Sequence, residues 1–233
     1  MNKKIECITV GDIQTNCWLY LPEDECNGQK PCAIIDPGDE ADHIIARLRE
    51  LNWAPAYILL THGHFDHLAA LPKLLAVFGN TASGSGPRVG IHRLDAQYLG
   101  KDSLRAHRDS FSTAGGDPAY VDALWKPMPD ADLFFEEGDT VGPFRVLLLP
   151  GHTPGSVGFY DEKAGVLFSG DTLFRGTWGR TDLPGGSEAQ IYQSLKRLLS
   201  MKGDIVVCPG HGPATTIEEE AGLLQYLQKR GFV

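Results

Sequence analysis

Short apolar runs and one amphipathic segment make up most of the first sixty residues of the 233-residue chain. Each apolar run is bounded by Gly, Pro, Asn or Asp, as is typical of β-strands. The amphipathic segment at residues 41–51 repeats its apolar positions every three or four residues, which predicts a helix with one buried face. The expected strands are Lys4–Val10, Cys17–Leu21, Cys32–Ile35 and Ala56–Leu60.

The C-terminal half returns to the same pattern from about Leu133. Ser187 with Gln190 forms a capping box, which predicts the start of a helix. Strands mixed with flanking helices predict an α/β fold in which two sheets are sandwiched between helices. The strands expected in this half are the hairpin Thr140–Leu149, Val157–Asp161, Val166–Ser169 and Ile205–Cys208.

Residues 80–130 interrupt this pattern. They are rich in Gly, Ser, Asp and Pro, with only a short strand and helix expected near Val89–Leu99. We interpret them as a loop-rich insertion, placed as a lid near a site, within a single domain that spans residues 1–233.

Composition narrows the possible functions. The formal net charge of -9 makes a broad basic surface for nucleic acid or an anionic membrane unexpected. No apolar run has the length of a signal peptide core or approaches the roughly 18 residues of a membrane span. Five scattered cysteines are typical of reduced thiols in a cytoplasmic protein.

Metal-ligating side chains are concentrated in the segment THGHFDH, which directly follows an expected strand. Three further loops, PGHTPGS, SGDTLF and PGHGP, each place a histidine or an aspartate beside glycine after an apolar run. Imidazole and carboxylate are common ligands of Zn²⁺ and related ions, and seven ligands suit two ions that share one carboxylate. The candidate ligands are His62, His64, Asp66, His67, His152, Asp171 and His211.

Isolated histidines have a simpler interpretation. His43, His92 and His107 stand apart from the metal motifs, and we interpret them as structural or solvated. Hydroxyl groups beside the ligands can fix the imidazole tautomers, and turn capping is their alternative role. The candidates for this role are Thr61, Thr153 and Ser169.

Four residues are candidates for contact with a substrate. Arg180 in the segment GTWGRTD can bind an anionic group, because guanidinium forms a planar fork that suits carboxylates. A structural ion pair with Asp182 is the alternative. Phe65, Phe174 and Trp178 can line a cleft, with packing in the core as the alternative.

The ordered motifs THGHFDH, GHTPGS, SGDTLF and PGHGP resemble the metallo-β-lactamase superfamily over nearly the whole chain, and GDTLF with GRTD is similar to the single-domain glyoxalase-II-like hydrolases. The resemblance implies a four-layer αββα sandwich with a dinuclear metal site at one edge. The implied ligands are His62, His64 and His152 for one ion and Asp66, His67 and His211 for the other, with Asp171 bridging both.

The activity implied by this resemblance is hydrolysis of a thioester, an S-acylglutathione such as S-lactoylglutathione, by a hydroxide that bridges two divalent ions. Zinc is expected, with iron or manganese as alternatives, and Asp66 orients the nucleophile and accepts a proton. Hydrolysis of a lactone or carboxylic ester remains open, as does a persulfide dioxygenase with one iron on His62, His152 and Asp171. We expect a small-molecule substrate and a monomer or homodimer.

Overall fold

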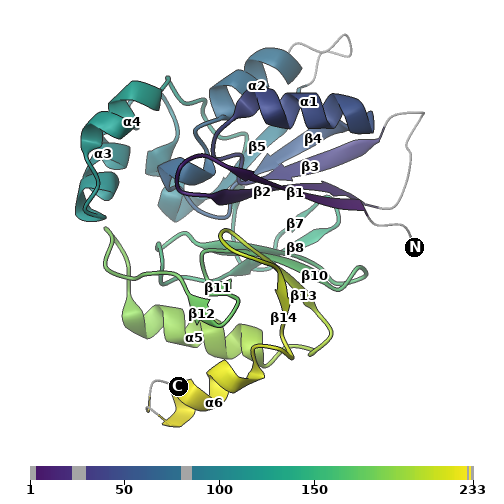
Figure 1. Cartoon of the computed structure of the whole chain (residues 1–233), viewed down its shortest axis with the longest axis vertical. Coiled ribbons are helices and arrows are strands. Elements are labelled where there is room, and N and C mark those ends of the chain that lie inside the picture. The colour runs from purple at the N-terminus through teal and green to yellow at the C-terminus, as the bar shows by residue number, and fades with distance from the viewer. Residues whose placement is uncertain (1–3, 23–29, 80–85, 230, 232–233) are drawn as a thin grey trace.

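The chain forms four layers in the computed structural model, with two facing sheets between two pairs of helices (Figure 1). The pair α1 and α2 covers the first sheet, and the pair α5 and α6 lies beneath the second. The predicted α/β fold with an αββα arrangement is therefore confirmed. The structure describes residues 4–22, 30–79, 86–229 and 231.

The first sheet has the strand order β1-β2-β3-β4-β5-β6. Its first three strands are antiparallel, whereas β3 to β6 run parallel, so that the carboxyl ends of these four strands reach the same edge. The strands are β1 (Lys4–Val10), β2 (Thr15–Leu21), β3 (Pro31–Ile35), β4 (Ala54–Leu59), β5 (Arg88–His92) and β6 (Leu133–Phe135).

The second sheet has the strand order β14-β13-β10-β9-β8-β7, in which only the neighbours β10 and β13 are parallel. The predicted hairpin of β7 and β8 turns at Gly142, which has a positive φ of 55°. A two-stranded hairpin of β11 and β12 lies beside this sheet. The bounds are β7 (Thr140–Val141), β8 (Phe144–Leu148), β9 (Val157–Asp161), β10 (Val166–Gly170), β11 (Leu173–Phe174), β12 (Thr177–Trp178), β13 (Val206–Pro209) and β14 (Thr215–Thr216).

The outer helices pack through their apolar stripes. On α1 the stripe that the sequence predicts is buried from Ala41 to Leu48, and on α5 the Ser187 hydroxyl accepts a hydrogen bond from the backbone N–H of Gln190, as the capping box predicts. Aromatic rings, among them those of Tyr20 and Phe168, fill the space between the sheets. The outer helices are α1 (Ala41–Leu51), α2 (Leu71–Phe78), α5 (Glu188–Leu199) and α6 (Ala221–Lys229).

The segment predicted as a loop-rich insertion is largely regular in structure. Strand β5 lies inside the first sheet between β4 and β6. The 3-10 helix η2 (Arg93–Tyr98) follows it, and α3 (Leu104–Thr113) and α4 (Pro118–Leu124) lie at one end of the layers (Figure 1). The strand and helix expected near Val89–Leu99 correspond to β5 and η2, but the loop-rich prediction is wrong for α3 and α4. On α3 the buried residues are mainly His107 and Ser110, so this helix shows no apolar stripe. Residues 80–85 lie outside the described ranges.

The start of β2 joins the two sheets at one edge. The backbone N–H of Asn16 donates to Gly210 O at 2.7 Å, and the Asn16 side-chain amide donates to the carbonyls of Pro209 and Gly212 at 3.1 and 2.7 Å. The indole of Trp18 also donates to Pro209 O, at 2.9 Å. These bonds fix the loop after β13 against the first sheet.

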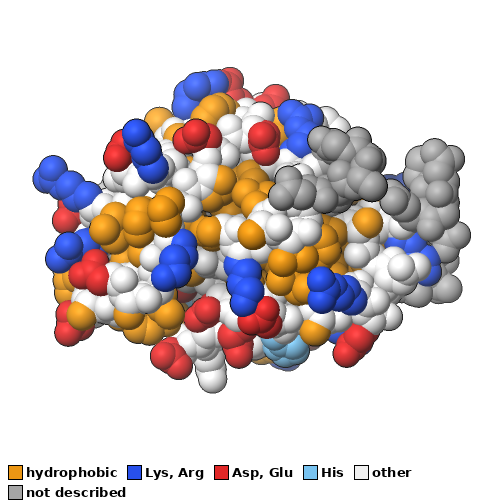
Figure 2. Space-filling view, turned by 90° about the horizontal axis from the view of Figure 1, so that it is seen from above, with side chains coloured by type: hydrophobic (Ala, Val, Ile, Leu, Met, Phe, Trp, Pro, Cys, Tyr) orange, Lys and Arg blue, Asp and Glu red, His pale blue; other side chains and the backbone are white. Residues whose placement is uncertain are grey.

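The surface carries charges of both signs. On the face seen in Figure 2, Lys and Arg side chains are interspersed with Asp and Glu. None of the helices within the described ranges has both the length and the apolarity needed to cross a membrane. The free cysteines are Cys7, which is exposed, and Cys17, Cys32 and Cys208, which are buried; Cys26 lies outside the described residues.

Candidate metal centre and substrate cleft

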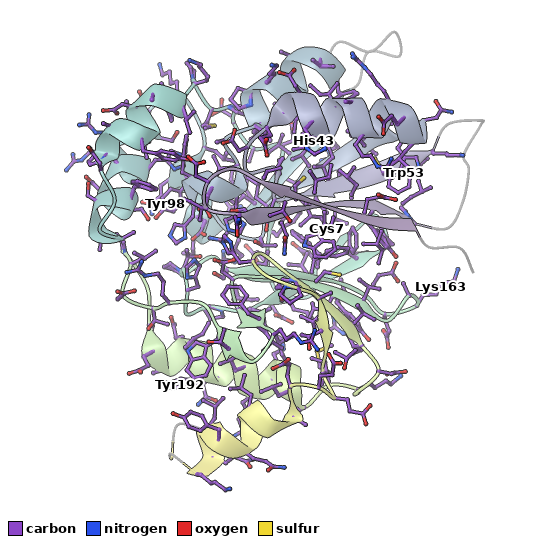
Figure 3. The ribbon with its side chains drawn as sticks, in the orientation of Figure 1. Cys7, His43, Trp53, Tyr98, Lys163 and Tyr192 are labelled. Carbon is purple, nitrogen blue, oxygen red and sulfur yellow. The ribbon has the colours of Figure 1, made fainter. Side chains whose placement is uncertain are left out.

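The four metal motifs meet at the edge where β2 joins the sheets. THGHFDH follows β4 of the first sheet, whereas the other three motifs follow β8, β10 and β13 of the second. The backbone N–H of Val157 donates to Thr61 O at 2.8 Å, which ties the first loop to the start of β9. Helices η2 and α3 lie beside this edge, on the side where Tyr98 is labelled in Figure 3.

Three buried histidines form the first group. His62, His64 and His152 each offer one ring nitrogen, and these nitrogens lie within 4.8 Å of one another. Nδ1 of His64 lies 2.8 Å from Nε2 of His152. The three side chains that the sequence assigns to one ion are therefore brought together, although His152 comes from the opposite sheet.

Asp66, His67 and His211 form the second group, again with one ligand atom from each within 4.8 Å of the others. Asp66 Oδ2 lies 3.5 Å from His67 Nε2 and 3.4 Å from His211 Nε2. His67 is fully buried, whereas His211 is partly exposed. The second ligand set of the sequence prediction is therefore also assembled.

Asp171 lies between the two groups. Its Oδ2 is 3.5 Å from Nε2 of His152 in the first group and 3.5 Å from Nε2 of His211 in the second. Its Oδ1 is 3.5 Å from Nε2 of His67. One carboxylate thus reaches both groups, as a bridging ligand must.

The donor atoms fit metal ions. His62 Nε2, His67 Nε2 and Asp171 Oδ1 are buried and have no hydrogen-bond partner within the described part of the chain. Leaving a buried polar atom unpaired costs about 1–3 kcal/mol, so the presence of several such atoms at one place, with Nε2 of His64 among them, fits a site that binds a cation. Imidazole nitrogen and carboxylate oxygen are the usual donors to Zn²⁺, iron and manganese.

The two groups differ in charge. Burial lowers the pKa values of His62 and His64 well below the usual range, so both rings are neutral and present lone pairs. Burial opposes protonation of His67 too, but the carboxylates of Asp66 and Asp171 raise its pKa to about 10. A cation that binds the second group must therefore displace a proton from His67.

Asp36, which is not among the residues predicted from the sequence, supports the second group. Its Oδ2 lies 3.0 Å from Nδ1 of His67 and accepts a hydrogen bond from the Thr61 hydroxyl at 2.6 Å, while its Oδ1 accepts from the Thr61 N–H at 2.8 Å. This fixes the His67 tautomer so that Nε2 faces the group. Asp36 follows a buried strand and precedes Pro37-Gly38, the same signal that identified the other loops.

Hydroxyl and carbonyl groups hold the remaining ligands. The Thr15 hydroxyl donates to Asp66 Oδ2 at 2.9 Å, and Thr61 Oγ1 lies 3.1 Å from Nδ1 of His62, the role that the sequence predicts for Thr61. Ser169 instead donates to the carbonyl of Leu173, a turn contact. The carbonyl of Arg180 accepts from Nδ1 of His152 at 2.7 Å.

A cleft of about 320 Å³ opens onto both groups. Phe65 and Arg180, two of the four side chains expected to contact a substrate, line this cleft. The Arg180 guanidinium also forms the alternative ion pair, with 2.7 and 2.8 Å bonds to the two carboxylate oxygens of Asp182. Its carbonyl, rather than its side chain, contacts a metal-site residue.

Phe174 and Trp178 are not among the residues that line this cleft. The Phe174 ring lies 6.0 Å from that of His211, measured between centroids, so it packs behind a ligand. Trp178 packs edge-on against Tyr192 at 5.8 Å, the core role that was its alternative. Side chains that the sequence did not suggest line the cleft instead, namely Ile13, His107, Ser110, Phe111, Ala114 and Leu183.

The three other histidines differ in their surroundings. His43 is exposed on α1, and the His92 ring accepts a hydrogen bond from the N–H of Leu94. His107 is 1% exposed, and its Nε2 lies 2.9 Å from the carbonyl of Tyr98. The structural interpretation therefore holds for His92 and His107, although His107 also forms part of the cleft wall.

Comparison with known proteins decides the family. The model of the metallo-beta-lactamase superfamily matches residues 10–211. The chain belongs to this superfamily. It is 38% identical to the hydroxyacylglutathione hydrolase GloC of Haemophilus influenzae over 221 residues, which cover 93% of this chain and 94% of that protein.

Two solved structures of the superfamily share the fold closely with this chain. The di-iron-bound form of TTHA1623 is 37% identical to this chain, with a TM-score of 0.76. The match covers 93% of this chain and 96% of the chain of TTHA1623. The B3 metallo-beta-lactamase BLEG-1 is 33% identical to this chain, with a TM-score of 0.76. The match covers 96% of this chain and 99% of the chain of BLEG-1.

Proposed function

We propose that this superfamily member is a dinuclear metal hydrolase that cleaves thioesters of the S-acylglutathione type. The observation that carries the proposal is the presence of two complete three-ligand groups with Asp171 within reach of both. A site for one ion would need only His62, His152 and Asp171. The second group, whose ligand atoms lie within 4.8 Å of one another around the buried His67, therefore favours the dinuclear hydrolase over the dioxygenase with one iron.

Two divalent ions held there would supply a hydroxide at neutral pH and an electrophile for a carbonyl oxygen. Burial raises the pKa of Asp66, but the charges of His67 and His211 outweigh this effect and hold the pKa well below the usual range. Asp66 also lies at the cleft wall. Its carboxylate is therefore ionised and able to orient a water molecule and accept its proton.

The cleft supports a substrate with an extended, partly apolar arm. Ile13, Phe111 and Leu183 line the cleft alongside the metal-binding side chains. The name of the Haemophilus influenzae relative supports a thioester of glutathione as the substrate. Arg180 is the cation in the cleft lining that a carboxylate of such a substrate would meet, in competition with Asp182.

We further propose zinc as the native metal, with the di-iron form of TTHA1623 supporting iron as an alternative. We also propose a small-molecule substrate, a cytoplasmic location, and a monomer or homodimer. Elemental analysis of the purified protein and its elution volume in size-exclusion chromatography test the metal and the oligomeric state.

The decisive experiment measures four quantities in one preparation: the metal content, the hydrolysis of S-lactoylglutathione, the hydrolysis of a lactone, and oxygen uptake with glutathione persulfide. We expect about two ions per chain, hydrolysis of S-lactoylglutathione, and no oxygen uptake with glutathione persulfide. His211→Asn should bind about one ion fewer and lose most activity, whereas His43→Asn makes the same change at an exposed position and should behave as wild type. One iron per chain with oxygen consumption would overturn the proposal, and preference for a lactone would overturn its thioester part.

A further inference from the structure

Asp95 is a fully buried carboxylate outside the candidate ligand sets. It lies on η2, and three donors converge on it. Its Oδ2 accepts hydrogen bonds from the Gly63 N–H at 3.0 Å and from the Thr153 hydroxyl at 2.7 Å. Its Oδ1 accepts from the Gly155 N–H at 2.9 Å. Both oxygens are thus used within the protein, and Asp95 is not among the residues that line the cleft.

These donors belong to the two loops that carry the first ligand group. Gly63 lies between His62 and His64, and Thr153 directly follows His152. The first loop leaves β4 of the first sheet, whereas the second connects β8 to β9 of the second sheet. One side chain therefore joins two loops from opposite sheets, both adjacent to ligands of the same group.

The fit around Asp95 is tight. A Cβ atom added at Gly155 would lie 2.5 Å from Asp95 Oδ1, and a Cβ at Gly63 would overlap the ring of Tyr98. Tyr98 ends the same 3-10 helix, and its ring is edge-on to that of His64 at 5.9 Å. Helix η2 thus contacts the first loop at both Gly63 and His64, which restricts the positions that the loop can adopt.

We propose that Asp95 is a positioning residue that fixes His62 and His64 against His152 for the first ion. Two of its three donors are backbone N–H groups that cannot turn away, so an acceptor is needed at both oxygens. In Asp95→Asn an NH2 group would replace one of the two acceptor oxygens. One of the donors would then face another N–H group and lose its hydrogen bond. The loops would then separate, and the first ligand group would lose its spacing. The inference rests on the proposed metal site but not on the proposed substrate.

The test uses Asp95→Asn with Asp161→Asn as the matched control. Asp161 is also a buried carboxylate, and it accepts from the Tyr20 hydroxyl at 2.7 Å and from the Ala164 N–H at 2.9 Å, two donors that lie on β2 and in the turn between β9 and β10 rather than on a ligand loop. Both variants are titrated with Co²⁺, and the affinity, the stoichiometry and the visible spectrum of the bound ions are recorded. Unfolding in denaturant measures the stability of each.

We expect Asp95→Asn to weaken binding of one Co²⁺ ion by about 10–100-fold and to change its spectrum, because outer partners of metal ligands typically contribute that much. The turnover number should fall more than the Michaelis constant changes. Asp161→Asn should lose stability but bind Co²⁺ as the wild type does. If Asp95→Asn does not fold, Thr153→Val removes one of the three bonds and should give a smaller loss of affinity in the same direction.

Wild-type Co²⁺ affinity and spectrum in a folded Asp95→Asn variant would overturn the proposal. An equal loss of Co²⁺ affinity in Asp161→Asn would also overturn the proposal, because the loss would then follow from lower stability of the fold and not from the contacts of Asp95. The failure of the proposed function has a different signature. A wild-type protein that binds two Co²⁺ ions but does not hydrolyse thioesters would reject the substrate, while the effect of Asp95→Asn on ion binding would stand.

Discussion

His107 gives the cleft wall an acid-sensitive group. Its side chain is 1% exposed, and Nε2 lies at hydrogen-bonding distance from the carbonyl of Tyr98, so that Nε2 carries the proton of the neutral ring. Nδ1 is buried and has no partner within the described residues. Burial therefore lowers the pKa of His107 to about 4.

The sign of the pH dependence follows from this lowered pKa. In the unfolded chain a histidine has a pKa of about 6.5, so between that value and about 4 the unfolded state binds more protons than the folded state. The free energy of unfolding then falls as the pH falls through this range. With about 1.4 kcal/mol for each pKa unit, His107 should cost the protein roughly 2–3 kcal/mol of stability by about pH 4.5.

The assay is denaturant unfolding of wild type and His107→Gln at about pH 7.5 and about pH 4.5, with a chelator present so that loss of metal does not contribute. Glutamine can still donate to Tyr98 O but does not titrate. Between the two pH values His107→Gln should lose roughly 2–3 kcal/mol less than wild type. His43→Gln, at an exposed position, should lose as much as wild type. Parallel losses in wild type and His107→Gln would refute the reasoning.

Three further predictions concern the metal site and the core. Asp171→Ala should lose both ions and nearly all activity, because it removes a donor from each group; near-normal metal content would contradict the bridging role. Gly63→Ala should cost about 1–3 kcal/mol in denaturant unfolding and weaken metal binding, since the new Cβ overlaps the buried ring of Tyr98. Tyr20→Phe should cost about 1.5–3 kcal/mol by losing its bond to Asp161, with activity unchanged; a matching loss of turnover would show coupling that the contacts do not suggest.

The sequence predicts the parts of the fold that depend on local periodicity. The stripe on α1 and the apolar runs of the strands are visible because each element buries one face or both. The ligands are visible too, because His, Asp and Gly after a strand form a local signal, and the edge at which parallel strands end brings distant loops together. The motifs and the family that they resemble therefore suffice to assign His62 and His152 to one group.

What the sequence does not show depends on tertiary contacts. Asp95 is an ordinary acidic residue in the sequence. Asp36 follows a buried strand as the ligand loops do, but its role, like that of Asp95, depends on donors supplied by other loops. Helix α3 is not predicted from the sequence, because its buried residues are the polar side chains His107 and Ser110, which line the cleft. Trp178 resembles a cleft aromatic in the sequence, and only its neighbour Tyr192 shows that it packs elsewhere.

The order in which the chain is synthesised has a consequence for metal acquisition. The second ligand group joins His67 to His211, and the bonds from Asn16 that position the loop of His211 span nearly the whole sequence. A nascent chain that has emerged only as far as Asp171 already holds the histidines of the first group, but it has no partner for the start of β2. If the site holds two ions as proposed, the second group could bind its ion only after β13 has docked, so that its loading would follow the formation of these long-range contacts.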